Sequence, residues 1–252
     1  MNLDQIFEKI VILYEDDELL AIDKPSGLVV HSDGRTDEPS VADWLERVRP
    51  EIKDVGEPWT RPDGTTLHRP GIVHRIDRET SGVLLICKTQ DLFLRMKEKF
   101  KKREVGKSYL AFLYGELRTN EGVIDRPIAK SRKDFRLWSA QPGGRGEMRE
   151  AATEYRVIER GSGFTYVEAR PKTGRTHQIR VHFKAINYPI VGDRLYAPKR
   201  EMALGFKRLA LHAAKISFTL ENKGAMVIEA PIPDDFQRAE AAMTGRTGES
   251  VA

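Results

Sequence analysis

The stretch His74–Cys87 reads HRIDRETSGVLLIC and joins a charged loop directly to a continuous apolar run. The apolar part, Gly82–Cys87, predicts a short strand that is buried on both faces. The loop before it places three bases and two acids beside this strand, where a low dielectric can tune ionisable groups for function. The alternative interpretation is a polar loop that only caps the strand.

Similar apolar runs on both sides of this stretch predict further strands joined by short turns. The expected strands are Val11–Tyr14, Leu19–Asp23, Gly82–Cys87, Lys107–Tyr114, Thr153–Ile158, Phe164–Ala169, Leu209–Ala214, Lys215–Leu220 and Ala225–Ala230. Amphipathic spacing predicts helices at Ser40–Arg49, Gln90–Lys102 and His177–Ile186. Because strands outnumber helices, we expect an α+β fold with a mainly antiparallel sheet. We assign residues 1–238 to one domain and residues 239–252 to a flexible tail.

The composition is that of a globular protein with a packed core. Of its 252 residues, 40% are hydrophobic and 32% are charged. The apolar runs are too short to cross a bilayer, and Met1–Ile10 lacks the basic start and apolar run of a signal peptide. The single cysteine, Cys87, excludes an internal disulfide and is typical of a reducing compartment, so we expect a cytoplasmic protein.

The charge is unevenly distributed along the chain. The net charge is +4, with acids concentrated in residues 1–20 and bases in residues 95–107 and 130–184. Separate basic patches indicate a partner lined with phosphates, such as RNA. For Lys97–Lys102 the alternative is a solvated helix face.

A second candidate constellation is Lys172–His182, which reads KTGRTHQIRVH. Gly174 permits an unusual backbone conformation, and Thr176 can cap a helix whose free amides suit a phosphate. Helical spacing places His177 beside Arg180 on this helix. The alternative is a solvated helix end.

Five segments, each weak alone, occur in a specific order along the chain. They are Lys24–Gly27 (KPSG), His74–Asp77 with Thr80–Gly82 (HRID and TSG), Lys107–Tyr109 (KSY), Lys172–Arg180 (KTGRTHQIR) and Gly192-Asp193. Together they make residues 11–232 resemble the RluA family of pseudouridine synthases. Ile76 stands where leucine is the usual family residue, which is a mild change.

The resemblance implies a pseudouridine synthase catalytic fold, with a mainly antiparallel mixed sheet, flanking helices and a central RNA-binding cleft. It implies that Asp77 is the catalytic carboxylate, which attacks the sugar or the base or takes a ribose proton. It also implies that Arg180 keeps Asp77 charged and that Tyr109 lies against the uracil ring. Without the resemblance, Tyr109 is a core tyrosine on a strand.

The resemblance further implies an RNA-binding set and an isomerisation that needs no cofactor. Arg75 would enter the RNA stack in place of the flipped uridine. The other expected RNA contacts are Lys24, Lys172, Arg175 and His177. We expect no metal site, because none of the six histidines forms a ligand pair with a cysteine and His177 and His182 lie on different helix faces.

The expected substrate is structured RNA, with large-subunit ribosomal RNA favoured and transfer RNA open. We expect a monomer without an obligate protein partner or a membrane association. Many relatives carry a small RNA-binding domain ahead of the catalytic one, and here the catalytic pattern starts by residue 11, so we expect no such domain. The rival hypothesis is a non-catalytic RNA-binding or ribosome-assembly protein on the same scaffold.

Overall fold

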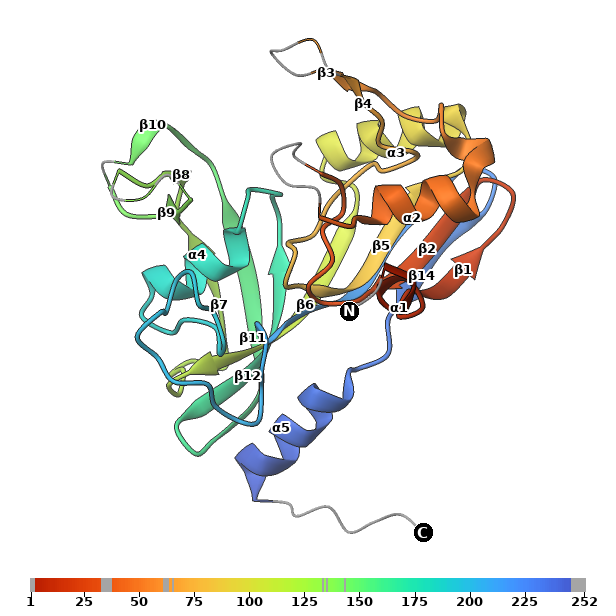
Figure 1. The fold of residues 1–252 in the computed structure, drawn as a ribbon. Helices are drawn as coiled ribbons and strands as arrows, with labels where there is room; N and C mark the ends of the chain where they lie inside the picture. Colours follow the sequence, from red (N-terminus) through yellow and green to blue (C-terminus); the bar gives the residue numbers. More distant parts are fainter. Residues whose placement is uncertain are drawn as a thin grey trace, which may run out of the picture. The chain divides into compact units, whose positions relative to one another are not determined.

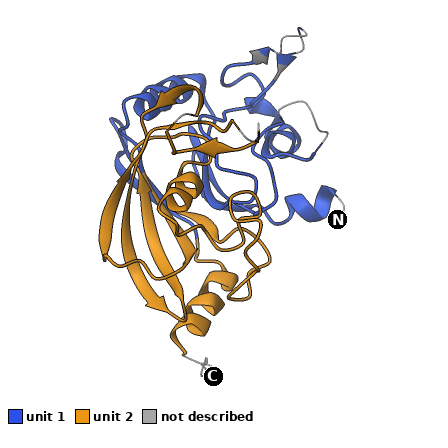
Figure 2. Cartoon of the chain, turned by 90° about the vertical axis from the view of Figure 1, so that its left-hand side faces the viewer, with its two compact units in different colours: residues 1–106, 215–230 blue, residues 107–214, 231–252 orange. Residues whose placement is uncertain are grey.

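The structure is a computed structural model that describes residues 3–32, 38–60, 64, 66–132, 134, 136–142 and 144–245 (Figure 1). Its internal contacts divide the chain into two compact units (Figure 2). Unit 1 comprises residues 1–106 and 215–230, and unit 2 comprises residues 107–214 and 231–252. The single domain expected over residues 1–238 stays a prediction, as does the central RNA-binding cleft.

Unit 1 is built around three antiparallel strands, β1 (Val11–Glu15), β2 (Leu19–Lys24) and β5 (Ser81–Cys87), paired in the order β1-β2-β5. Every residue of β5 is buried, as its continuous apolar sequence predicts. Helix α3 (Gln90–Lys101) begins at the N-cap Thr89 and covers one face of these strands. Its buried Leu92, Phe93 and Met96 join one core with side chains of β2 and β5.

The remaining elements of unit 1 are short. They are α1 (Leu3–Phe7), α2 (Val41–Val48), the 3-10 turn η1 (Pro50–Ile52), the small strands β3 (Trp59–Thr60) and β4 (Thr66–Leu67), and β14 (Gly224–Glu229). Helix α2 begins where the sequence predicts, because Ser40 and Asp43 form a reciprocal capping box.

Unit 2 contains four consecutive antiparallel strands in the order β6-β12-β11-β7. Their bounds are Gly106–Tyr114 for β6, Phe164–Pro171 for β12, Ala152–Gly161 for β11 and Glu121–Asp125 for β7. Phe112 and Tyr166 stack at 4.3 Å on the face that packs against Phe236 of α5 (Asp234–Thr244). The opposite face carries Tyr155, which packs against Phe183 of α4 (Gln178–Ala185). A separate three-stranded sheet consists of β8 (Ile128–Lys130), β9 (Trp138–Ser139) and β10 (Arg145–Arg149).

The α+β class and the antiparallel pairing are confirmed, while two local expectations are wrong. The two strands expected at Leu209–Ala214 and Lys215–Leu220 form one strand, β13 (Leu211–Leu220). Lys215 does not break it, because its side chain occupies an exposed position and pairs with Glu229 on β14. Helix α4 begins at Gln178, after His177 rather than after Thr176, because His177 adopts a left-handed conformation with φ +55°.

The C-terminal end is helical for longer than the sequence suggests. Residues 239–244, which we assigned to a flexible tail, belong to α5, and Ala239 and Met243 are buried. Residues 246–252 lie outside the described part of the chain. None of the helices in the described residues is long and apolar enough to cross a membrane.

Candidate active site

Asp77 lies in the loop that leads into β5. The buried side chain of Ile76 anchors the loop immediately before it, and Asp77 itself is half-buried. The backbone N–H of Thr80 donates to the carbonyl of Asp77 at 3.1 Å, which closes a tight turn. Arg75 is exposed on the same loop. The loop thus holds a carboxylate near the buried strand and an arginine toward solvent.

The Lys24–Gly27 segment braces this turn. The backbone N–H of Gly27 donates to the Arg78 carbonyl at 2.9 Å, and the Ser26 hydroxyl donates to the Glu79 carbonyl at 2.7 Å. Gly27 has φ +90°, a conformation that favours glycine. The first two sequence segments that carry the family resemblance are therefore parts of one hydrogen-bonded structure.

Lys24 adds three hydrogen bonds to this structure from the buried side. It is fully buried, and its Nζ donates to the carbonyls of Pro25, Leu28 and Arg78 at 2.8, 2.7 and 3.1 Å. The expectation that Lys24 contacts RNA is wrong, because its ammonium is enclosed and oriented toward backbone oxygens. Its hydrogen bonds hold the backbone of the Asp77 turn at Arg78.

His74 ties the other end of the loop to β5. Its Nε2 accepts a hydrogen bond from the backbone N–H of Leu85 at 2.9 Å, and its ring stacks on Phe100 at 4.9 Å. An acceptor Nε2 carries no proton, so this contact fits the neutral ring. Sequence reasoning assigned no role to His74, although the HRID motif contains it.

In unit 2, Tyr109 lies on the same sheet face as α4. It pairs with Ala169, which pairs with Tyr155, and cross-strand partners share a face. Lys107 lies two residues earlier on this face and is half-buried, and its Nζ would be 3.9 Å from a Cβ on Gly174. Burial lowers the pKa of Lys107. Lys107 lies beside Gly174 of the KTGRTHQIR motif, and the sequence interpretation left it without a role.

The segment before α4 is fixed by Gln178. Its Oε1 accepts from the Thr173 hydroxyl at 2.6 Å and from the Arg175 backbone N–H at 3.0 Å. Its Nε2 donates to Ala152 and Thr153 of β11, each at 3.0 Å. The buried Gln178 thus fastens the Thr173–Arg175 loop to the sheet, which accounts for much of the long KTGRTHQIR motif.

Arg180 forms a buried ion pair with Asp193. Its Nε and Nη2 donate to the two carboxylate oxygens, both at 2.8 Å, and the two side chains are 8% and 1% exposed. Such paired hydrogen bonds fix the direction of a guanidinium. The partner was missed from the sequence, although the Gly192-Asp193 motif contains it. Gly192 is required there because a Cβ would lie 2.1 Å from the Arg208 carbonyl oxygen.

Tyr196 links this ion pair to His177. The Arg180 guanidinium lies 5.0 Å from the centre of the Tyr196 ring, and the Tyr196 hydroxyl is 2.9 Å from Nδ1 of His177. The same hydroxyl accepts from the Trp138 backbone N–H at 3.0 Å. His177, Arg180, Asp193 and Tyr196 therefore form one connected network in unit 2.

Comparison with known proteins identifies the family to which the Asp77 loop and the Arg180 network belong. The family model described as RNA pseudouridylate synthase matches residues 18–185. The chain belongs to this family. Ribosomal large subunit pseudouridine synthase D of Xanthomonas campestris pv. campestris is 36% identical over 244 residues, which cover 92% of this chain and 69% of the relative. An uncharacterized RNA pseudouridine synthase of Aquifex aeolicus is 36% identical over 237 residues, covering 90% and 70% of the two chains.

Solved structures of pseudouridylate synthases share the fold. Human RNA Pseudouridylate Synthase Domain Containing 4 matches with a TM-score of 0.71 at 23% identity, covering 96% of this chain and 95% of that one. The resemblance to the RluA family is confirmed, and with it an isomerase of the pseudouridine synthase type.

The remaining expected RNA contacts of this synthase lie in unit 2. Lys172 is exposed and pairs with Glu154 at 2.8 Å, and Arg175 donates through Nε to the Glu150 carbonyl at 3.0 Å. His177 is half-buried in the network described above. Asp77 belongs to unit 1, whereas Tyr109 and Arg180 belong to unit 2, so their joint action is a proposal. Within the described residues, no three His, Cys, Asp or Glu side chains are grouped to hold a metal ion.

The basic face of α3 is the solvated, ion-paired surface that the sequence left as an alternative. Lys97 pairs with Glu57, and Lys101 and Lys102 both lie within 4 Å of Glu98. Exposed pairs of this kind partly cancel the positive field that phosphate would meet. The positive field of α3 is therefore weaker than its number of lysines alone would give.

Replacing Lys24 tests its positioning role. We expect Lys24→Met to lower the free energy of unfolding by about 1–3 kcal/mol, because the buried Leu28 carbonyl and two partly buried carbonyls lose their donor. Lys172→Met serves as the control and should change stability by less than about 1 kcal/mol, because its ion pair is exposed. Urea unfolding of both variants measures this. Unchanged stability of Lys24→Met together with weaker RNA binding would instead restore Lys24 as a phosphate contact.

Stability should also depend on pH through His182 of α4. This residue is fully buried, with Nδ1 2.9 Å from the Thr153 hydroxyl and Nε2 3.0 Å from the Arg126 carbonyl. Burial lowers the pKa of His182, so the unfolded chain takes up a proton that the folded chain refuses. We expect stability to fall as the pH drops below about 6.5, the ordinary histidine value.

The His182→Leu variant isolates this contribution. It should be less stable than the wild type at pH 7, by about 1–3 kcal/mol, because the buried Thr153 hydroxyl and the Arg126 carbonyl lose a hydrogen-bond partner. Its stability should fall less steeply than that of the wild type between pH 7 and 5. The free energy of unfolding is measured with urea at pH 7 and at pH 5. If the variant and the wild type lose the same stability between these pH values, groups other than His182 cause the acid sensitivity.

Proposed function

We propose that this synthase converts a uridine of large-subunit ribosomal RNA to pseudouridine, with Asp77 as the catalytic carboxylate. The observation that carries the proposal is the brace around the Asp77 turn. The buried Lys24, together with Ser26 and Gly27, fixes the backbone of this turn at Arg78 and Glu79. Such fixation is what a carboxylate needs to meet a reacting atom in a defined direction. The name of the Xanthomonas relative supports the choice of ribosomal RNA.

The reaction breaks the bond between ribose C1′ and uracil N1 and forms a bond between C1′ and uracil C5. The C5 hydrogen leaves as a proton, and N1 gains one, so no oxidant, reductant or group donor takes part. Asp77 enters as an anion, whether it attacks the sugar, attacks the base or takes a ribose proton. Tyr109 packs against the uracil ring, and Arg180 stabilises the negative charge of Asp77.

Arg75 completes the proposed RNA interaction. A uridine inside a folded RNA must leave the base stack before an enzyme can reach it. Arg75 is exposed and lies two residues before Asp77. A guanidinium at this position can stack in the space that the flipped base leaves.

Release of the uridine C5 hydrogen tests the proposal. The full-length protein is incubated with unmodified transcripts of large-subunit ribosomal RNA or of transfer RNAs, each labelled with tritium at uridine C5. We expect tritium to appear in water with the ribosomal transcript and not with the transfer RNAs. Release from a transfer RNA alone would replace the proposed substrate. Binding without release from any transcript would support the rival hypothesis of a non-catalytic RNA-binding protein.

A further inference from the structure

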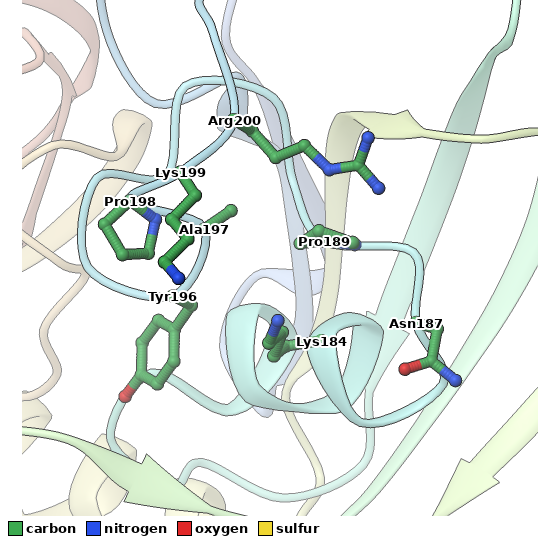
Figure 3. Close-up of a pocket in the computed structure, with 8 residues that line it drawn as sticks. All are labelled: Lys184, Asn187, Pro189, Tyr196, Ala197, Pro198, Lys199 and Arg200. Carbon is green, nitrogen blue, oxygen red and sulfur yellow. The ribbon is translucent and has the colours of Figure 1, made fainter.

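Unit 2 contains a hollow of about 620 Å³ between the end of α4 and the loop that follows Asp193 (Figure 3). Among the described residues its lining combines cations with flat apolar groups and contains no carboxylate side chain. The lining residues are Lys184, Asn187, Pro189, Tyr196, Ala197, Pro198, Lys199 and Arg200. A volume of this size lies in the range of pockets that hold small organic ligands.

The three cations of the hollow differ from those on α3. Lys184, Lys199 and Arg200 are exposed, and within the described part of the chain none of them pairs with an acid. In Figure 3, Lys184 lies on α4 and Lys199 points from the loop toward Tyr196, whereas Arg200 points to the other side of the loop. Three positive charges without an acidic partner around one hollow attract an anion. The phosphate groups of a nucleic acid are anions that lysine and arginine bind well.

The walls of the hollow are held in place by the Arg180 network. The backbone N–H of Ala197 donates to the Asp193 carbonyl at 2.8 Å, and Asp193 also accepts from the Tyr196 N–H at 3.0 Å. The Arg200 guanidinium lies over the Tyr114 ring at 5.5 Å. A ligand in the hollow would therefore sit at a fixed position relative to Arg180.

We propose that this hollow binds one unpaired nucleotide of the substrate RNA, separate from the uridine that reacts. Lys184 and Lys199 contact its phosphate, Arg200 contacts a neighbouring phosphate, and the apolar wall at Pro189, Pro198 and Tyr196 accommodates its base. Aromatic and apolar surfaces take up bases of any kind, so this subsite selects single-stranded structure rather than sequence. The proposal rests on the proposed function in taking RNA as the ligand, and it adds a second anchor for that RNA.

Binding of a fluorescently labelled oligouridylate of eight nucleotides tests the proposal. The triple variant Lys184→Gln/Lys199→Gln/Arg200→Gln should bind it about tenfold more weakly, and the slope of log affinity against log salt should fall by about 0.7 for every phosphate that the variant no longer neutralises. The control is Lys97→Gln/Lys101→Gln/Lys102→Gln on α3, which removes the same charge. It should bind within about twofold of the wild type, because its lysines lie on α3 and do not line the hollow.

The outcomes separate the sources of the ligand. Equal weakening in the two triple variants would overturn the proposal, because general charge would then explain the binding. Uridine 5′-monophosphate that competes as strongly as the oligonucleotide would also overturn it, in favour of a free nucleotide. A midpoint temperature of thermal unfolding equal to that of the wild type verifies that the variants are folded. Failure of the proposed function is distinct, because it appears as absent tritium release by the wild type.

Discussion

Asp77→Asn should abolish turnover while leaving RNA binding intact. The substitution keeps the shape of the side chain but removes its charge and its capacity to attack. We expect single-turnover pseudouridine formation to fall by at least about a thousandfold, as when the nucleophile of another enzyme is removed. Binding should be as tight as in the wild type or tighter, because the variant has one negative charge fewer near the phosphates.

Glu79→Gln provides the matched control for Asp77→Asn. Glu79 is a half-buried acid in the same loop, 3.6 Å from the Arg78 guanidinium. The Glu79→Gln variant loses the same charge by the same chemical change as Asp77→Asn. The backbone carbonyl of residue 79 still accepts the hydrogen bond from the Ser26 hydroxyl. We expect its turnover to stay within about threefold of the wild type, as for substitutions outside the reacting groups. A tenth of wild-type turnover in Asp77→Asn would remove Asp77 from the catalytic role.

The second large effect concerns Arg180 and its partner Asp193. Arg180→Met should lower the free energy of unfolding by about 3–5 kcal/mol, because it leaves the buried Asp193 carboxylate unpaired. Asp193→Asn should also destabilise, because it leaves the Arg180 guanidinium without its counter-charge. Either single variant would lose activity for structural reasons alone, so neither by itself assigns a catalytic role.

The double variant Arg180→Met/Asp193→Asn separates structure from chemistry. It removes both charges, and an asparagine can still accept the backbone bonds that Asp193 receives from Leu195 and Tyr196. We expect urea unfolding to recover most of the stability of the wild type, because no buried charge is left unpaired. Turnover should stay at least about a hundredfold below the wild type, which is the usual effect of removing one electrostatic stabiliser. Turnover that recovers together with stability would make Arg180 purely structural.

The sequence predicted the elements well where one local signal was enough. The continuous apolar run predicted β5, and the amphipathic spacing of residues 40–49 predicted α2. The start of α4 was misjudged because Thr176 has good capping chemistry, whereas the left-handed conformation of His177 depends on its surroundings, including Tyr196. A contact with a residue 19 positions away leaves no local signature.

Site residues were predictable in identity more than in role. Lysine in a KPSG segment suggests a phosphate contact, and only three-dimensional structure reveals that the Lys24 ammonium is enclosed by three carbonyls. Asp193 was part of a quoted motif, yet its pairing with Arg180 depends on how the chain returns to α4. The division of the expected catalytic residues between two units has no signal in the sequence, because it follows from long-range packing.

Unit 1 is formed by two separate stretches of the chain, so it cannot be completed until the second stretch has been translated. The unit needs residues 215–230, and its core includes Ile216, Phe218 and Ile228. These residues are made roughly 6–25 s after residue 106, at the usual rates of translation of about 5–20 residues per second. Throughout this interval the first hundred residues present apolar strands without their final partners. The apolar side chains that these residues cover in the finished unit stay exposed during this interval, which favours their binding by chaperones that hold nascent chains.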